Sequence, residues 1–84
     1  MRPVNHEKEK EKRICKWLLL AYEESQKPDF NPWRVWAELG RFNLTRRDVD
    51  AYLIERGYNP FERGAYVRFV KENLQSVIEN ANDC

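Results

Sequence analysis

The sequence predicts an all-α fold: a compact domain of three or four helices with a helix-turn-helix-like central pair. Apolar residues recur at helical spacing, residues that cap helices precede the apolar stretches, and no window alternates polar and apolar residues as a strand does. The chain has 84 residues, of which 42% are hydrophobic and 13% aromatic, which is enough for one core. We therefore expect residues 1–84 to form a single helical domain, with frayed ends at 1–7 and 81–84.

Residues 8–25 are expected to form the first helix, because their apolar residues fall within about a third of a helical wheel. A second, shorter helix is expected over 32–39. Asn31 offers its N-cap, and Pro32 suits the first helical position. Gly40 would then end this helix in the left-handed conformation. The apolar stripe of the first helix comprises Ile14, Trp17, Leu18, Ala21 and Tyr22.

The third helix is expected over residues 45–56. Thr45, three residues before Asp48, forms a variant of the capping box in which Asp replaces the usual Glu. Gly57 ends the helix. Helical spacing places Leu53 on the face that packs into the core.

The fourth helix is expected over about residues 60–80. Asn59-Pro60 repeats the Asn-Pro start of the second helix. Alternatively, the helix begins at Gly64, since a glycine inside a helix costs about 1 kcal/mol relative to alanine. The apolar stripe of this helix comprises Tyr66, Val67, Val70, Leu74, Val77, Ile78 and Ala81.

The charges of the chain nearly cancel. Lys and Arg number 15, Asp and Glu number 14, and the formal net charge is +1. Such a balance gives no overall field that would hold a nucleic acid or an anionic membrane, so an electrostatic partner must be recognised locally. The longest apolar run, 17–22, is far shorter than the roughly 20 residues that span a bilayer, and the N-terminus is charged. We expect a soluble, intracellular, cytoplasmic protein with no membrane partner.

Few residues suit catalysis or metal binding. Cys15 and Cys84 lie far apart and His6 is the only histidine, so no metal-binding spacing is present. Cys15 flanks the apolar stripe of the first helix and is expected to be a packed structural residue. Adjacent acids such as Glu23 and Glu24 lie in solvated, charge-rich stretches. We expect no enzyme activity, no catalytic residues, no cofactor and no metal.

Residues 32–58 resemble the second and third helices of helix-turn-helix and winged-helix DNA-binding domains. The third-helix region reads Leu44-Thr45-x-x-x-Val49-x-x-x-Leu53-x-x-x-Gly57-Tyr58. The resemblance implies that its leucines and valine are core, that its threonine caps a recognition helix, and that exposed side chains beyond the cap meet the major groove of double-stranded DNA. Residues 34–68 also contain seven Arg and no Lys, and arginine suits phosphate and guanine contacts. The candidate nucleic-acid-binding residues are Arg41, Arg46, Arg47, Asp50 and Arg63.

A second resemblance is to helix-extended-loop-helix modules of the SAP type. It covers Leu44 to Leu74, with an Arg-Gly pair after the first helix and Gly64 before the second. Like the first resemblance, it covers less than half of the chain.

Apolar residues that lie off the predicted stripes favour a different function. They could form a patch for a protein partner or for self-association, in an interaction or inhibitory adaptor module without catalysis. A helix of about eight residues also has little room to bury both Trp33 and Trp36 on one stripe. The candidate partner-binding residues are Leu20, Ile54, Phe69 and Trp33. Because the helix-turn-helix-like motif is the more specific signal, we expect a nucleic-acid-binding regulatory module, with the protein-interaction module as the alternative.

Overall fold

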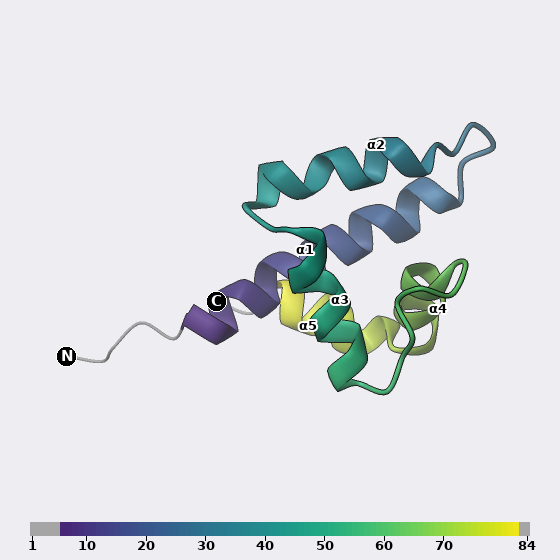
Figure 1. The fold of residues 1–84 in the computed structure, drawn as a ribbon. Coiled ribbons are helices and arrows are strands. Elements are labelled where there is room, and N and C mark those ends of the chain that lie inside the picture. The colour runs from purple at the N-terminus through teal and green to yellow at the C-terminus, as the bar shows by residue number, and fades with distance from the viewer. Residues whose placement is uncertain (1–5, 83–84) are drawn as a thin grey trace.

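A computed structural model of the protein, which describes residues 6–82, is all-α, as the sequence predicts (Figure 1). Over these residues the chain forms five α-helices and one 3-10 helix, and no strand. Of the ends expected to be frayed, residues 1–5 and 83–84 lie outside the described residues, whereas residues 6 and 7 belong to the first helix and residues 81 and 82 to the last. The elements in chain order are α1 (His6–Ser25), α2 (Pro32–Ala37), the 3-10 helix η1 (Glu38–Phe42), α3 (Arg46–Glu55), α4 (Ala65–Glu72) and α5 (Leu74–Asn82).

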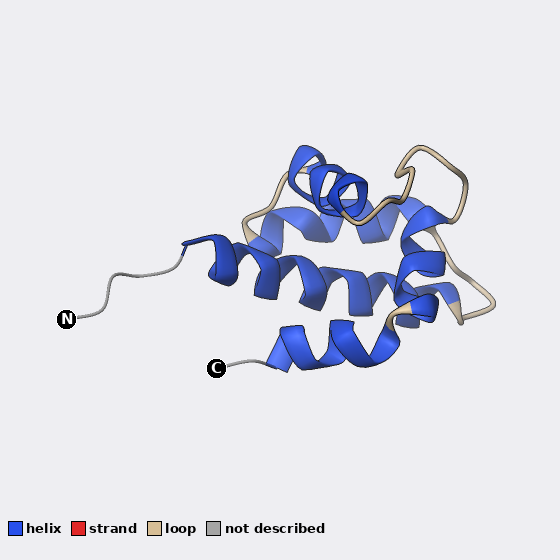
Figure 2. Cartoon of the chain, turned by 90° about the horizontal axis from the view of Figure 1, so that it is seen from below, coloured by secondary structure: helices blue, strands red, loops and turns tan. Residues whose placement is uncertain are grey.

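Helix α1 is the central element, and every other helix packs against it. The connected α2 and η1 run back antiparallel along the C-terminal half of α1, and α3 crosses it (Figure 1). Helix α5 lies beside the N-terminal half of α1 (Figure 2). A long central helix covered on several sides buries enough apolar surface for a chain this short to fold.

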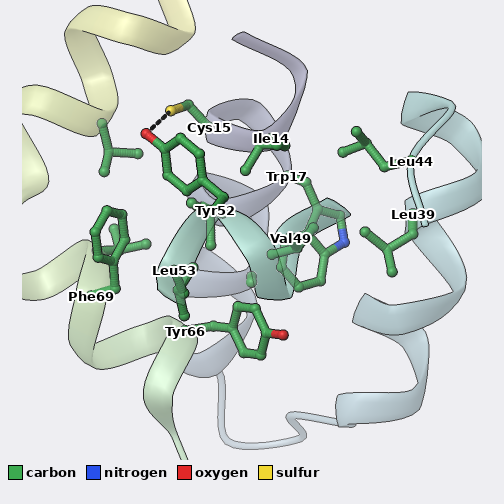
Figure 3. Close-up of a cluster of buried hydrophobic side chains, with 14 of the residues drawn as sticks. Ile14, Cys15, Trp17, Leu39, Leu44, Val49, Tyr52, Leu53, Tyr66 and Phe69 are labelled. Carbon is green, nitrogen blue, oxygen red and sulfur yellow. Dashed lines mark hydrogen bonds between the residues drawn. The ribbon is translucent and has the colours of Figure 1, made fainter. Parts of the chain in front are cut away.

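The core is built around the predicted apolar face of α1. Trp17 is 1% exposed, and its indole N–H donates to the carbonyl of Val35 on α2 at 2.8 Å. Its ring lies 5.4 Å from the ring of Tyr66, edge to face (Figure 3). Cys15 is fully buried, as expected of a packed structural cysteine. The helix-turn-helix resemblance assigned three residues to the core, and all three are buried: Leu44, Val49 and Leu53.

Two of the predicted helix starts are confirmed at atomic detail. The side chain of Asn31 accepts the backbone N–H of Trp33 at 3.0 Å, with Pro32 in the first turn. Thr45 and Asp48 form the reciprocal capping box, in which the N–H of Thr45 donates to the Asp48 carboxylate at 2.9 Å. This backbone hydrogen bond is the main reason why the pKa of Asp48 is lowered from its ordinary value.

The predicted end of the second helix is wrong. Gly40 is not left-handed; the chain tightens into η1 and continues to Phe42, and Asn43 takes the positive φ of 56° instead. The N–H of Leu44 then bonds the carbonyl of Leu39 at 3.0 Å, the six-to-one hydrogen bond of a Schellman motif. Both leucines are buried, so their packing, rather than the nearest glycine, decides where the helix ends.

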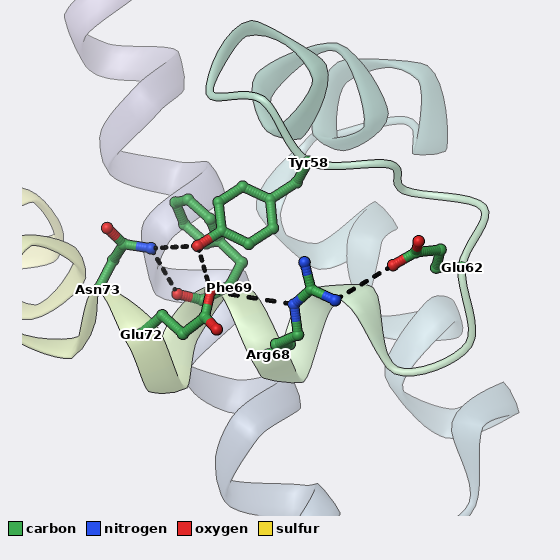
Figure 4. A network of polar contacts seen from close by, with 6 residues as sticks. All are labelled: Tyr58, Glu62, Arg68, Phe69, Glu72 and Asn73. Atoms are coloured by element: carbon green, nitrogen blue, oxygen red, sulfur yellow. Dashed lines mark hydrogen bonds and ion pairs between the residues drawn. The ribbon is translucent and has the colours of Figure 1, made fainter.

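The predicted fourth helix is two helices. The side chain of Asn59 accepts the N–H of Phe61 and so forms a turn, not a helix start. Helix α4 begins after Gly64, whose φ is 74°, at the alternative start that the sequence offered. The run then breaks at Asn73, whose φ is −129°. The Asn73 side chain donates to the carbonyl of Phe69 and to the hydroxyl of Tyr58, both within 3.1 Å (Figure 4). A long-range side-chain contact therefore holds the break.

The placement of Phe69 on the surface is wrong for the same reason. A wheel drawn through one helix over 60–80 puts Phe69 off the stripe, but α4 ends before the break and has its own inner face. Phe69 is 3% exposed and packs edge to face on Tyr52 and Tyr58, with ring centroids 5.8 and 5.0 Å apart. It is a core residue and takes no part in a docking surface.

Candidate functional site

The two arginines at the start of α3 point into different grooves. Arg46 lines a groove shared with α2 and η1, whereas Arg47 lines a groove shared with the N-terminal half of α1. Successive helical residues point about 100° apart, so neighbours at the start of one helix can line different surfaces. The predicted cluster of Arg46 and Arg47 is therefore divided between two surfaces.

The first groove, here called the Trp33 groove, is open, apolar and about 520 Å³ in volume. Its most exposed wall is Trp33, of which 80% is accessible to solvent. Trp36 is anchored instead, because its ring lies 5.3 Å from that of Trp17 and 5.0 Å from that of Tyr66. Of the two tryptophans of α2, one therefore packs against the core and the other is available to a partner. The groove is lined by Pro32, Trp33, Trp36, Leu39 and Arg46.

Arg46 is held in place within this groove. Its guanidinium carbon lies 4.4 Å from the centre of the Trp36 ring, and its Nε is 3.8 Å from a carboxylate oxygen of Asp50. Its side chain is still 57% exposed, so part of the guanidinium faces solvent. Stacking on an indole fixes the plane of the guanidinium and leaves its edge able to bind an anion.

Asp50 is not on the solvent face where the sequence placed it. Its carboxylate accepts the hydroxyl of Tyr66, which comes from α4, and its side chain is only 16% exposed. Burial, followed by this hydrogen bond, raises the pKa of Tyr66. Asp50 ties α3 to α4 and is not available for a base edge.

The second groove, between α1 and α3, measures about 730 Å³ and carries both signs of charge. Lys10 pairs with Asp48 at 3.1 Å, and Arg56 pairs with Glu11 at 2.7 Å while stacking on Tyr52. Arg47 has no ion pair with any described residue. Most of the cations here are neutralised by the protein itself.

The remaining candidates are scattered. Arg41 pairs with Glu38 at 2.7 Å, and Arg63 is exposed in the loop before α4. Leu20 is half-buried on α1, and Ile54 is 55% exposed on α3, away from the lining of the Trp33 groove. Two of the sequence candidates, Trp33 and Arg46, line the same groove.

Exposed aromatic residues were missed at two places. Phe61 is 73% exposed and Phe30 is 39% exposed. A signal for Phe61 was present, because an aromatic residue follows Asn-Pro at both Asn31-Pro32-Trp33 and Asn59-Pro60-Phe61. Trp33 lies in the first turn of α2 and Phe61 lies in the turn before α4, and both side chains are exposed.

The cysteine that the structure describes is buried in the core. The thiol of Cys15 lies 3.4 Å from the hydroxyl of Tyr52, and burial raises its pKa, so little of the reactive thiolate forms near neutral pH. Residues 6–82 contain no group of three or more side chains that could hold a metal ion. Over the same residues, no helix combines the length and apolar character needed to cross a bilayer.

Comparison with protein families, with curated proteins and with solved structures found no match to this chain.

Proposed function

We propose that this chain is a protein-interaction module that binds its partner through the Trp33 groove. The observation that carries the proposal is the 80% exposure of Trp33 beside an apolar groove. A buried aromatic side chain removes about 150–250 Å² from water, which at about 25 cal/mol per Å² stabilises a complex by roughly 4–6 kcal/mol before association costs. An isolated domain gains nothing from leaving this side chain in water.

The composition and rigidity of the groove support the proposal. Tryptophan and arginine are among the residues enriched at the energetic centres of protein interfaces. Trp36 is fixed by the core, and Arg46 is fixed by stacking on Trp36. A preorganised surface loses little conformational entropy when a partner docks.

The test compares Trp33→Ala with Phe61→Ala in affinity capture from lysate of the source cells. Both substitutions remove an exposed aromatic residue after an Asn-Pro pair, but only Trp33 lines the groove. A protein captured by the parent is then purified and titrated by calorimetry. We expect Trp33→Ala to weaken its binding at least about tenfold, a loss of about 1.4 kcal/mol, and Phe61→Ala to leave it unchanged. Equal binding by Trp33→Ala and the parent would contradict the proposal.

Nucleic-acid binding by a helix-turn-helix-like pair stays as the second candidate. Arg47 and Arg63 favour it, because both are exposed and neither is in an ion pair among the described residues. Two other arginines support nucleic-acid binding less, because a carboxylate of the protein already lies beside each: Glu38 beside Arg41 and Asp50 beside Arg46. The net charge of +1 adds no general attraction to phosphate.

A duplex titration by fluorescence anisotropy separates the two functions. For a protein-interaction module we expect weak duplex binding near about 50 mM salt, with a shallow dependence on salt. The opposite result would be a binding constant that falls steeply with salt concentration on a log-log plot. In Arg47→Ala this slope would be flatter, and the affinity for duplex would be at least about tenfold weaker. That result would favour the nucleic-acid reading.

A further inference from the structure

The segment that precedes and begins α2 is exposed at every residue from 28 to 34. It carries two aromatic side chains, Phe30 and Trp33, and the carboxylate of Asp29, which has no ion pair with any residue the structure describes. Exposing aromatic side chains to water costs free energy, and this segment, here called the projection, exposes two of them within four positions. This projection needs a surface that is apolar and that carries a positive charge.

The Trp33 groove has these two properties. It is lined mainly by apolar and aromatic side chains, and the partly exposed guanidinium of Arg46 lies at its edge. Pro32 and Trp33 belong both to the exposed segment and to the groove wall, so the projection and the groove lie on one face of the molecule. A patch that places a projection beside its complementary groove can pair with itself about a two-fold axis.

We infer that the occupant of the Trp33 groove is a second copy of this chain, in a symmetric dimer in which residues 29–33 of each copy dock on the groove of the other. In this arrangement the Asp29 carboxylate of each copy meets the Arg46 guanidinium of the other. The inference rests on the proposed function, because it names the partner of the same groove.

The size of the patch sets the strength of the dimer. Phe30 is 39% exposed and Trp33 is 80% exposed, so docking them removes less than the area of two whole aromatic side chains, about 300–500 Å², which is well below the roughly 800 Å² per partner of a standard stable interface. The dimer is therefore reversible, and its population rises with protein concentration.

Sedimentation equilibrium over about 10 µM to 1 mM, the range of a weak complex, tests the inference with a charge exchange. The parent is expected to shift from monomer to dimer over this range. Asp29→Arg alone and Arg46→Asp alone each place two like-charge contacts across the axis and should weaken the dimer at least about tenfold. An equimolar mixture of the two variants should restore the dimer, because each then offers the charge that the other lacks.

Matched controls keep the result specific. Glu23→Arg and Arg47→Asp make the same charge changes at exposed positions outside the groove and should dimerise like the parent. Thermal melting checks that Arg46→Asp folds, and Trp33→Ala, which keeps all charges, should also be monomeric. A parent that stays monomeric at about 1 mM, or a mixture that fails to restore the dimer, overturns the inference. A monomeric parent that binds a captured protein through Trp33 overturns the dimer alone and leaves the proposed function intact.

Discussion

Trp17→Ala is expected to lower the free energy of unfolding by about 3–5 kcal/mol, the range measured for truncating a buried tryptophan. The side chain is 1% exposed, contacts the rings of Trp36 and Tyr66, and donates a hydrogen bond to Val35. Removing it opens a cavity where α1, α2 and α4 meet and leaves the Val35 carbonyl without this donor. A domain of this size is stable by roughly 4–13 kcal/mol, so the variant is close to unfolding.

Urea unfolding followed by circular dichroism measures the effect. Trp33→Ala is the control, since it removes the same side chain from the surface and should change stability by less than about 0.5 kcal/mol. Trp17→Phe should fall between the two, because it keeps an aromatic ring but loses the hydrogen bond. Similar losses for Trp17→Ala and Trp33→Ala would mean that the core is not organised around α1.

Phe69→Glu is expected to abolish folding at neutral pH. Phe69 is 3% exposed between Tyr52 and Tyr58, and a carboxylate there would be desolvated among aromatic rings. Ile54→Glu should fold like the parent, because Ile54 is 55% exposed and a glutamate remains hydrated there.

Far-ultraviolet circular dichroism and thermal melting distinguish these two variants. The helical spectrum should be lost in Phe69→Glu and kept in Ile54→Glu, with a melting temperature within a few degrees of the parent. The sequence alone put both residues on the surface, so a folded Phe69→Glu would restore that interpretation and contradict the break at Asn73.

The features that the sequence predicted correctly depend on neighbouring residues. The Asn31 cap and the Thr45–Asp48 capping box close within four positions, and their hydrogen bonds form wherever the helix lies. The apolar face of α1 also follows from spacing, because the helix runs without a break from His6 to Ser25. The all-α class required no more than these local signals.

The candidate site was predictable only in part. The sequence identified Trp33 and Arg46 separately, as members of two competing functions. Their common groove exists because α2 and the start of α3 both pack near Trp36, which the core holds in place. No spacing along the chain encodes that arrangement.

The sequence by itself determined the helical class, the caps and the buried face of α1, because each depends on contacts within a few residues. Only the tertiary structure decided that Phe69 is buried, that Asp50 binds Tyr66, and that Arg46 and Arg47 serve different grooves. The physical reason is that side chains from distant helices set these environments. The amide of Asn73 holds the break by bonding the hydroxyl of Tyr58, and the hydroxyl of Tyr66 reaches from α4 to α3; helical periodicity carries no information about either contact.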